Sequence, residues 1–517
     1  MAAPRQTPLF APALGVVAAA MAVPMLYALL AGDERVARAF FYAGAFTGFV
    51  AAIMGAALAG RRRLSGAQSE LVSLLIGWAV LPVFAAIPLA LLTPQLGLVG
   101  AWFEMVAAFT TTGGTGYADP ARVLPAIHLW RGIVAWLGGL LTLTAAYVVL
   151  APRRLGGFEV LTPSERSDGG DRQGGLAGAR LVELGAETPA LDMRLRRALR
   201  TILPVYGGLT ATLILLFGAF GDVSLTGVVH ALGIVSTSGV SADSGGFAAS
   251  GVLGIEIVAA VFLVLAASRL LYGGATRVGR QMKPLADPEL RLMALIVGLS
   301  TLALFARHWF SALTLEGEEA PVEVLSVIWG LVFTTLSYLT TTGYESAAWE
   351  SARAWAGLEN PALILLGLCA IGGGAATTAG GLKLIRAATL YRHGMVEIDH
   401  LIEPLAVRGS GASGRGRLQE GAFIAWAFIM LYTVAIFATS LGLTLTGLNF
   451  ETAQIAAIAA VSNTGPAFGA VAPGHADFSL LDSAQRAVVA AGMILGRVET
   501  LAVIAIMRPN AWSLRSA

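Results

Sequence analysis

The chain has few of the residues on which metalloenzymes and nucleic-acid-binding proteins depend. Only one of its 517 residues is a cysteine, Cys369, which excludes an internal disulfide framework and a cysteine-rich zinc or iron–sulfur site. Its six histidines form no HExxH motif and no close pair, so they offer no metal centre. Charged residues make up 13%, about half the share of an ordinary soluble domain. The net charge of +2 leaves no basic excess for nucleic acid.

Apolar residues, in contrast, make up 56% of the chain, and many lie in long uninterrupted stretches. A bilayer-crossing helix needs roughly 20 such residues. The first stretch has no small-residue cleavage site after it, so we expect a true first helix and not a signal peptide. Ten spans are predicted, near residues 9–31, 37–60, 69–95, 130–151, 199–219, 251–275, 289–307, 359–390, 420–447 and 487–507.

Lysine and arginine are distributed unevenly between the two sides of these spans. With the N-terminus in the cytoplasm, the termini and the loops 61–67, 152–198, 276–291 and 391–419 carry 22 of the 34 basic residues. The opposite side carries seven. Because basic loops stay cytoplasmic, the sequence predicts an inner-membrane protein with both termini in the cytoplasm.

Four apolar segments are too short to cross the membrane, near 101–110, 224–236, 322–339 and 452–462. Each ends in a small polar cluster with a glycine, namely Gly113, Gly239, Gly343 and Gly465, at spacings of 126, 104 and 122 residues. This is a fourfold repeat of span, short helix, loop and span. We therefore predict an all-α membrane protein with two extra N-terminal helices (1–63) and pore repeats at 68–154, 198–283, 289–392 and 420–510.

The repeated loops carry the chemistry expected of a cation pathway. Non-helical backbone at membrane depth must be buried in protein or line an aqueous path. Glycine permits a positive φ that turns carbonyls towards an axis, the short helices point their negative ends there, and threonine adds oxygens. Asp119, Asp243 and Glu345, just outside, would concentrate cations. The alternative is four unrelated re-entrant turns. The candidate K+ ligands are Thr111, Thr112, Gly113, Ser238, Gly239, Thr341, Thr342, Gly343, Asn463, Thr464 and Gly465.

Several sequence blocks surround these clusters in a fixed order. They are Phe103-Glu104 with Thr110 to Thr115, Trp130-Arg131 with Trp136 to Gly139, His230-Ala231 with Ser236 to Gly239, Leu339 to Tyr344, Asn463 to Gly469, and Leu495 to Glu499. Together they resemble the membrane subunit of the Trk/Ktr/HKT superfamily of potassium transporters, most closely its TrkH-like branch. The resemblance implies a pseudo-fourfold pore with Gly113, Gly239, Gly343 and Gly465 as filter glycines. It also implies a homodimer and a TrkA-like cytoplasmic regulatory subunit that binds nucleotide.

The second repeat departs from the family pattern at two places. Val240 follows Gly239 where an aromatic residue is usual, and Ser268-Arg269 replaces a block of small residues. These departures affect the detailed geometry of the second loop and therefore the exact ion selectivity.

The eighth predicted span contains five glycines within ten residues, followed by Lys383 and Arg386. Each glycine costs about 1 kcal/mol of helix propensity, so we predict that the helix breaks into an intramembrane loop that obstructs the pore. Close packing of small residues is the alternative. The predicted gate comprises Gly372, Gly373, Gly374, Thr377, Thr378, Gly380, Gly381, Lys383 and Arg497.

Arg497 lies within the last predicted span, where facing lipid would cost at least about 2.5 kcal/mol. We expect it to face the interior, against the loop, Glu499 or carbonyl groups, as an electrostatic barrier to cations or as part of a structural ion pair. Glu104, inside the first short helix, is predicted to be a hydrogen-bonded brace. The Gly409 to Gly414 motif matches GxGxxG, but no strand precedes it, so it is interpreted as a linker and a docking candidate.

The leading hypothesis is K+ uptake through a gated filter, with the lipid bilayer as environment, no bound cofactor and no nucleic-acid partner. A Na+-conducting relative and an H+- or Na+-coupled symporter of the same fold remain alternatives. An intramembrane enzyme would need a paired nucleophile and base or a metal motif, and the spans contain neither.

Overall fold

A computed structural model describes residues 10–58, 67–151, 191–243, 245–269, 287–311, 324–357, 360–402, 412–471 and 477–498. All regular structure in these ranges is helical. The chain begins with α1 (Phe10–Ala20), α2 (Ala22–Leu30) and α3 (Glu34–Leu58), which pack on one another as a unit before the repeats. In an unbroken helix the backbone N–H and C=O groups bond to one another, so an apolar helix can cross lipid, which offers them no hydrogen-bond partner.

The four repeats follow in chain order, each with a short helix at its centre. Repeat 1 contains α4 (Ala67–Ala85), α5 (Ile87–Leu92), α6 (Gly97–Phe109), α7 (Pro125–Ala145) and η3 (Ala146–Leu150). Repeat 2 contains α10 (Leu191–Ala219), α11 (Leu225–Val235) and α12 (Leu253–Ala266). Repeat 3 contains α13 (Pro288–Ser311), α14 (Val324–Leu339), α15 (Trp349–Trp355), α16 (Ala362–Ile371) and α17 (Leu384–Ile402). Repeat 4 contains α18 (Ala412–Leu445), α19 (Phe450–Val461), α20 (Pro466–Val471) and α21 (Ser483–Val498).

The four short helices α6, α11, α14 and α19 lie where the four short apolar segments were predicted. The described residues contain seven helical segments long and apolar enough to cross a membrane. Each overlaps one of the ten predicted spans. The other three predictions differ: α12 has only 14 residues, the 359–390 span is interrupted after Ile371, and α21 is described only to Val498. Glu499 and residues 403–411 lie outside the described residues. The linker prediction for Gly409 to Gly414 is wrong for its last three residues, because Ala412 to Gly414 begin helix α18.

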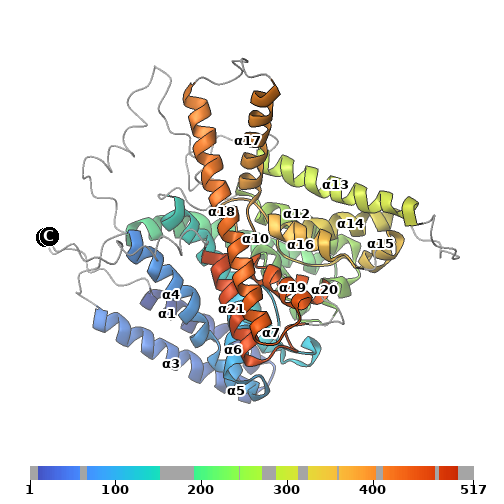
Figure 1. Ribbon diagram of the computed structural model, residues 1–517. Coiled ribbons are helices and arrows are strands. Elements are labelled where there is room, and N and C mark those ends of the chain that lie inside the picture. Colours follow the sequence, from blue (N-terminus) through green and yellow to red (C-terminus); the bar gives the residue numbers. More distant parts are fainter. Residues whose placement is uncertain are drawn as a thin grey trace, which may run out of the picture.

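The short helices form the centre and the long helices form the periphery. Almost every residue from Phe103 to Phe109 and from Val229 to Val235 is buried, whereas outward side chains such as Leu215, Leu302 and Phe437 are well exposed. Such large exposed apolar side chains suit contact with lipid. Helices α17 and α18 project together from the rest of the molecule (Figure 1).

Candidate functional site

Each of the four short helices ends in the same backbone arrangement. The N–H of Thr112 donates to the Ala107 carbonyl (2.8 Å), and the N–H of Thr111 donates to the Ala108 carbonyl (2.9 Å). The equivalent bonds at the ends of α11, α14 and α19 measure between 2.8 and 3.1 Å. This is the Schellman pattern, which satisfies the last carbonyls of a helix and turns the chain sharply. The four loops therefore leave their helices in the same direction.

The turn residue of this pattern has a positive φ in all four loops. The angle is 52° at Thr111, 52° at Thr237, 60° at Thr341 and 56° at Asn463. This position normally requires glycine, and a β-branched residue there is a conformational outlier that costs on the order of 1–3 kcal/mol. The sequence did not predict this feature, because threonine gives no signal for positive φ. Asparagine tolerates this region, so the outliers are the three threonines, and their equivalent places indicate a functional constraint on the loops.

A second shared feature is a hydroxyl pair that spans each turn. The Oγ atoms lie 2.7 Å apart in Thr110–Thr112, 3.0 Å in Ser236–Ser238, 3.3 Å in Thr340–Thr342 and 3.4 Å in Ser462–Thr464. All twelve residues of the four clusters up to the glycine are fully buried. The loops are therefore equivalent in side-chain bonding as well as in backbone.

The glycines show that the four loops close into a ring in chain order. A Cβ at Gly113 would lie 1.8 Å from the Ser238 carbonyl oxygen, and one at Gly239 would lie 2.0 Å from that of Thr342. A Cβ at Gly343 would meet Pro466 at 3.0 Å, and one at Gly465 would meet the Gly114 nitrogen at 2.2 Å. Each loop thus touches the next, and the fourth touches the first. All eleven predicted cation-ligand residues lie in this ring.

The fourth loop differs from the expectation for a filter glycine. Gly113, Gly239 and Gly343 have φ of 76°, 66° and 77°, but Gly465 is not in the positive-φ region. Its N–H donates instead to the Thr112 carbonyl at 2.6 Å, because Pro466 begins a helix directly after it. Glycine is needed here for the close approach of the first loop. The prediction of a positive φ is therefore wrong at this one position.

The predicted break in the eighth span is present between α16 and α17. Gly372 and Gly381 have φ of 74° and 73°, and a Cβ on Gly381 would lie 2.6 Å from the Gly372 Cα. The N–H groups of Leu382 and Lys383 each donate at 2.9 Å to carbonyls of α16. Residues 372–383 thus form a loop whose two ends touch. The break depends on glycines that can adopt a positive φ. The alternative, close packing of small residues, does not explain such a break.

This intramembrane loop is bonded directly to the four-loop ring. The Thr237 hydroxyl donates to the Thr378 hydroxyl (3.0 Å), and the N–H of Gly380 donates to the Thr341 hydroxyl (2.7 Å). A Cβ at Gly380 would lie 2.0 Å from the Ser462 carbonyl oxygen. The loop therefore lies against the second, third and fourth loops of the ring, and Gly372, Gly373, Gly374, Thr377, Thr378, Gly380, Gly381 and Lys383 all belong to it.

Arg497 connects the intramembrane loop with the first loop of the ring. Its Nε donates to the Thr110 carbonyl (2.8 Å), and its Nη1 donates to the Thr378 carbonyl (2.6 Å). The side chain is 8% exposed, and its Nη2 has no hydrogen-bond partner among the described residues. Arg497 therefore faces carbonyl groups of the interior. A cavity of about 40 Å³ lies beside it, lined in part by Ala376, Lys383 and Trp78.

A buried charge cluster holds the other side of the intramembrane loop. Arg269 lies three residues after the end of α12. It pairs with Asp287 (3.2 Å), just before α13, and with Glu289 (3.4 Å), within α13. The Glu289 carboxylate accepts the N–H of Ala375 at 2.9 Å, and the Ala267 carbonyl accepts that of Gly374 at 3.3 Å. Arg269 was noted in the sequence as a departure, but its acidic partners lie beyond an interval of 17 residues, and no local pattern connects them.

Comparison with known proteins agrees with this arrangement. Residues 250–514, just over half of the chain, match the model of the TrkH family, described as cation transport proteins. The chain belongs to the TrkH family. It is 28% identical over 84% of its length to the Trk system potassium uptake protein TrkI of Halomonas elongata, covering 82% of that protein. It is 25% identical to TrkH of Escherichia coli K12 over 95% of both chains.

The fold of the TrkH family is also shown by a solved structure. The crystal structure of the potassium transporter TrkH from Vibrio parahaemolyticus superposes with a TM-score of 0.76, at 23% identity, and the match covers 98% of each chain. The all-helical multi-pass architecture expected from the sequence is thereby confirmed. The family is one of transporters, which agrees with the absence of an enzymatic motif in the sequence.

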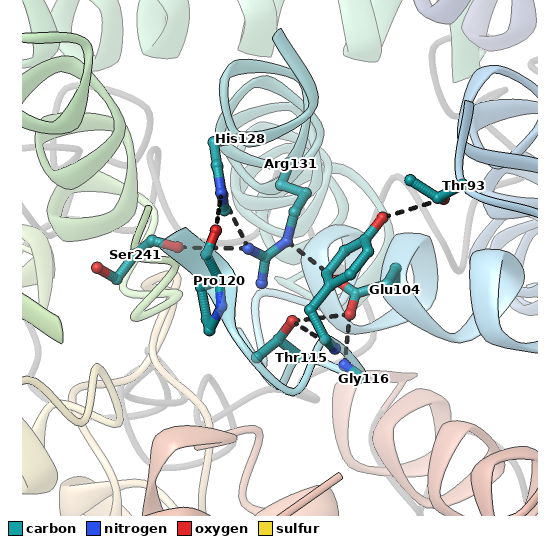
Figure 2. Close-up of polar contacts among 9 residues, drawn as sticks. Thr93, Glu104, Thr115, Gly116, Pro120, His128, Arg131 and Ser241 are labelled. Carbon is teal, nitrogen blue, oxygen red and sulfur yellow. Dashed lines mark hydrogen bonds and ion pairs between the residues drawn. The ribbon is translucent and has the colours of Figure 1, made fainter. Parts of the chain in front are cut away.

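On the far side of the ring from the intramembrane loop, this member of the TrkH family has a buried brace. Glu104 in α6 and Arg131 in α7 form an ion pair with 3.0 Å between Oε2 and Nε, at 0% and 2% exposure (Figure 2). Glu104 Oε1 accepts the Thr115 hydroxyl (2.8 Å) and the N–H of Gly116. Glu104 is therefore a brace, as predicted, and it fixes the segment that follows the first loop.

Arg131 extends the brace to the second repeat. Its Nη1 donates to the Ser241 carbonyl at 3.3 Å and lies 3.2 Å from His128 Nδ1, while His128 Nε2 contacts the Pro120 carbonyl (Figure 2). His128 and Ser241 were not predicted, since their proximity depends on two loops from different repeats.

Glu345 follows the third loop of the ring and lies partly buried. Tyr338 donates its hydroxyl to the carboxylate at 3.2 Å. Burial raises the pKa of Glu345 from 4.5 to about 6. The negative charge of Glu350 also raises this pKa, whereas the Tyr338 hydrogen bond and the positive charge of Arg353 lower it. The carboxylate is therefore charged at neutral pH and loses its charge in mildly acidic solution.

Proposed function

We propose that the chain takes up K+ across the bacterial inner membrane through a pore lined by the four-loop ring. The observation that carries the proposal is the ring itself, in which each glycine packs on the neighbouring loop and closes the circle in chain order. Rings of backbone and hydroxyl oxygens replace the hydration shell of a monovalent cation. The relatives named as potassium uptake proteins support K+ as the ion.

The proposed K+ ligands are the eleven predicted ring residues. They contribute carbonyl or hydroxyl oxygens. Repeats 1 and 2 supply Thr111, Thr112, Gly113, Ser238 and Gly239. Repeats 3 and 4 supply Thr341, Thr342, Gly343, Asn463, Thr464 and Gly465. The repeats are proposed to be units bounded at 68–154, 198–283, 289–392 and 420–510, after an N-terminal unit of 1–63. The basic loops support a cytoplasmic location for both termini in this proposal.

We propose further that the loop 372–383 is the gate. It lies against three loops of the ring, and Arg497 adds a buried positive charge between the ring and the loop. A charge so placed repels cations in a medium of low dielectric constant. For K+ to pass, the loop must release its bonds to Thr237, Thr341 and Arg497. Replacing Arg497 by Ala should then raise the transport rate or alter its K+ dependence, and an unchanged rate and K+ dependence would show that it is no barrier.

A homodimer and a TrkA-like nucleotide-binding subunit are proposed from the resemblance, supported by the relatives' names as components of a Trk system. The helix pair α17 and α18 projects beyond the other helices and offers a place for such a subunit (Figure 1). Co-purification of the full chain with a co-expressed TrkA-like protein, and the mass of the purified complex, test both partners.

The uptake function is tested by growth of a potassium-uptake-deficient bacterium at low K+. The wild-type chain should restore growth, and Gly343→Asp should not, because an added side chain would meet Pro466 and Thr464. Gly246→Ala is the matched control, since Gly246 also has a positive φ but no atom within 4 Å of an added Cβ. Failure of the expressed, inserted wild-type chain to restore growth would contradict the proposal. Growth dependent on Na+ or on a proton gradient would favour the coupled-transport alternative.

A further inference from the structure

The residue after each ring glycine differs among the four repeats, and only the third repeat has an aromatic residue there. Tyr344 follows Gly343, whereas Gly114, Val240 and Pro466 follow the others. The Tyr344 side chain is 2% exposed and crosses to the second repeat, where its hydroxyl donates to the Val240 carbonyl at 2.7 Å. The aromatic residue of one repeat thus holds the backbone of the neighbour that has none.

The ring of Tyr344 is fixed independently of its hydroxyl. It stacks on Phe247 with 5.0 Å between centroids, and it meets His230 edge to face at 5.5 Å. Phe247 in turn stacks on Phe333. Such contacts hold an aromatic side chain in one orientation. Removal of the hydroxyl alone should therefore leave the ring in place.

Helix α11 has a glycine, Gly233, at the point where the Tyr344 hydroxyl packs against it. A Cβ on Gly233 would lie 2.3 Å from the Tyr344 Oη and 3.2 Å from the Val240 carbonyl oxygen. Gly233 is within the helix, where alanine would be favoured by about 1 kcal/mol. Glycine at this position is explained by the space that the hydrogen bond needs.

The next residue of the second loop is held from the opposite side. The Ser241 carbonyl accepts from Arg131 of the first repeat at 3.3 Å, and the Ser241 hydroxyl lies 3.0 Å from His230 Nε2. Figure 2 shows this carbonyl directed at Arg131, which also pairs with Glu104. Two consecutive carbonyls, those of Val240 and Ser241, are therefore bound by side chains of repeats 3 and 1.

A carbonyl bonded to a side chain behind the loop is not directed at an ion on the axis. We propose that Tyr344 is a positioning residue for selectivity: it keeps the Val240 carbonyl turned away from the pore, so that the ion-facing oxygens of the second loop end at Gly239. A fixed set of ion-facing oxygens is the feature by which a filter discriminates K+ from Na+. This inference rests on the proposed K+ pathway and adds to it the residue that sets discrimination in the second repeat.

The experiment measures K+ and Na+ uptake separately, as KM and maximal rate, for the full chain in proteoliposomes. Tyr344→Phe should lower the K+ over Na+ preference roughly two- to tenfold, the range expected from one neutral hydrogen bond. Tyr432→Phe is the matched control, because it removes a buried hydroxyl that has no hydrogen-bond partner among the described residues. Equal loss of both cation rates in Tyr344→Phe, or an unchanged preference, would overturn the inference.

A second pair of variants separates selectivity from folding. Gly233→Ala should displace the Tyr344 hydroxyl and reduce both the amount of folded protein and the K+ preference. Adding Tyr344→Phe removes the atom nearest to the new methyl group, so the double variant should regain folded protein yet keep the lowered preference. A double variant with wild-type preference would contradict the role of Tyr344. If the wild-type chain carries no K+ at all, the proposed function fails, which is distinct from failure of Tyr344 alone.

Discussion

The ion pair between Glu104 and Arg131 gives the sharpest stability prediction, since both side chains are almost completely buried. Nε and Oε2 lie 3.0 Å apart, but neither atom is in an aligned hydrogen bond, so the attraction is mainly between the charges. Removing one partner of a buried pair costs about 3–5 kcal/mol because the other charge stays uncompensated. Removing both with apolar or neutral groups of similar size costs much less.

The two partners are not equivalent in what they leave behind. In Glu104→Gln the amide oxygen still accepts from Thr115 and Gly116, but Arg131 loses its counter-charge. In Arg131→Met the Glu104 carboxylate keeps those two donors, so we expect a smaller loss, about 2–3 kcal/mol. The double variant should lose about as much as the milder single variant. The size of the coupling free energy then equals the loss of the harsher single variant, about 3–5 kcal/mol.

The assay is a double-mutant cycle of unfolding free energies for the purified protein in detergent, titrated with denaturant. A matched pair away from the brace is Glu350 and Arg353, an exposed i,i+3 pair that should show a coupling below about 1 kcal/mol. If the effects of Glu104→Gln and Arg131→Met simply add, within about 0.5 kcal/mol, the account of the brace is refuted.

Three further outcomes are expected. Gly239→Ala should abolish K+ uptake, because its Cβ would lie 2.0 Å from a carbonyl oxygen of the third loop. Gly246→Ala should retain uptake, because no atom lies within 4 Å of its added Cβ. Comparable uptake by both variants would disprove the ring contact. Glu289→Gln keeps an acceptor for the N–H of Ala375 in the loop but loses the charge beside Arg269. The K+ leak through resting proteoliposomes should therefore rise several-fold. An unchanged leak would show that the cluster does not hold the gate. As external pH falls from 7 to 5, Glu345 is protonated around its raised pKa of about 6, so the apparent K+ affinity should weaken roughly twofold, because one carboxylate near the ring stops attracting cations. Glu345→Gln should remove this part of the pH dependence, and a variant that keeps it would exclude Glu345.

Features with a local cause were predictable from the sequence. The four short helices were predicted from apolar segments that end in small polar clusters, and each lies within a few residues of its expected range. The break at Gly372–Gly381 followed from the low helix propensity of consecutive glycines. The inward orientation of Arg497 followed from the cost of exposing a charge to lipid.

Features that depend on distant contacts were not predictable. The positive φ of Thr111, Thr237 and Thr341 is imposed by the Schellman turn and by the packing of neighbouring loops, against the preference of threonine. The N–H of Gly465 donates to the carbonyl of Thr112, which lies more than 350 positions earlier, and the local sequence gives no sign of this contact. Tyr344 and Val240 belong to different repeats, and nothing in either local sequence indicates the other.

The four-loop ring is proposed to discriminate between cations. Its most direct test is the ratio of K+ to Na+ flux through the purified chain in proteoliposomes, compared between the wild type and a variant with Gly113→Ala, whose Cβ would meet the Ser238 carbonyl oxygen at 1.8 Å. We expect a K+-preferring flux in the wild type and loss of flux or of preference in the variant. A wild type that carries both ions equally well, or a Gly113→Ala variant with wild-type flux and preference, would contradict it.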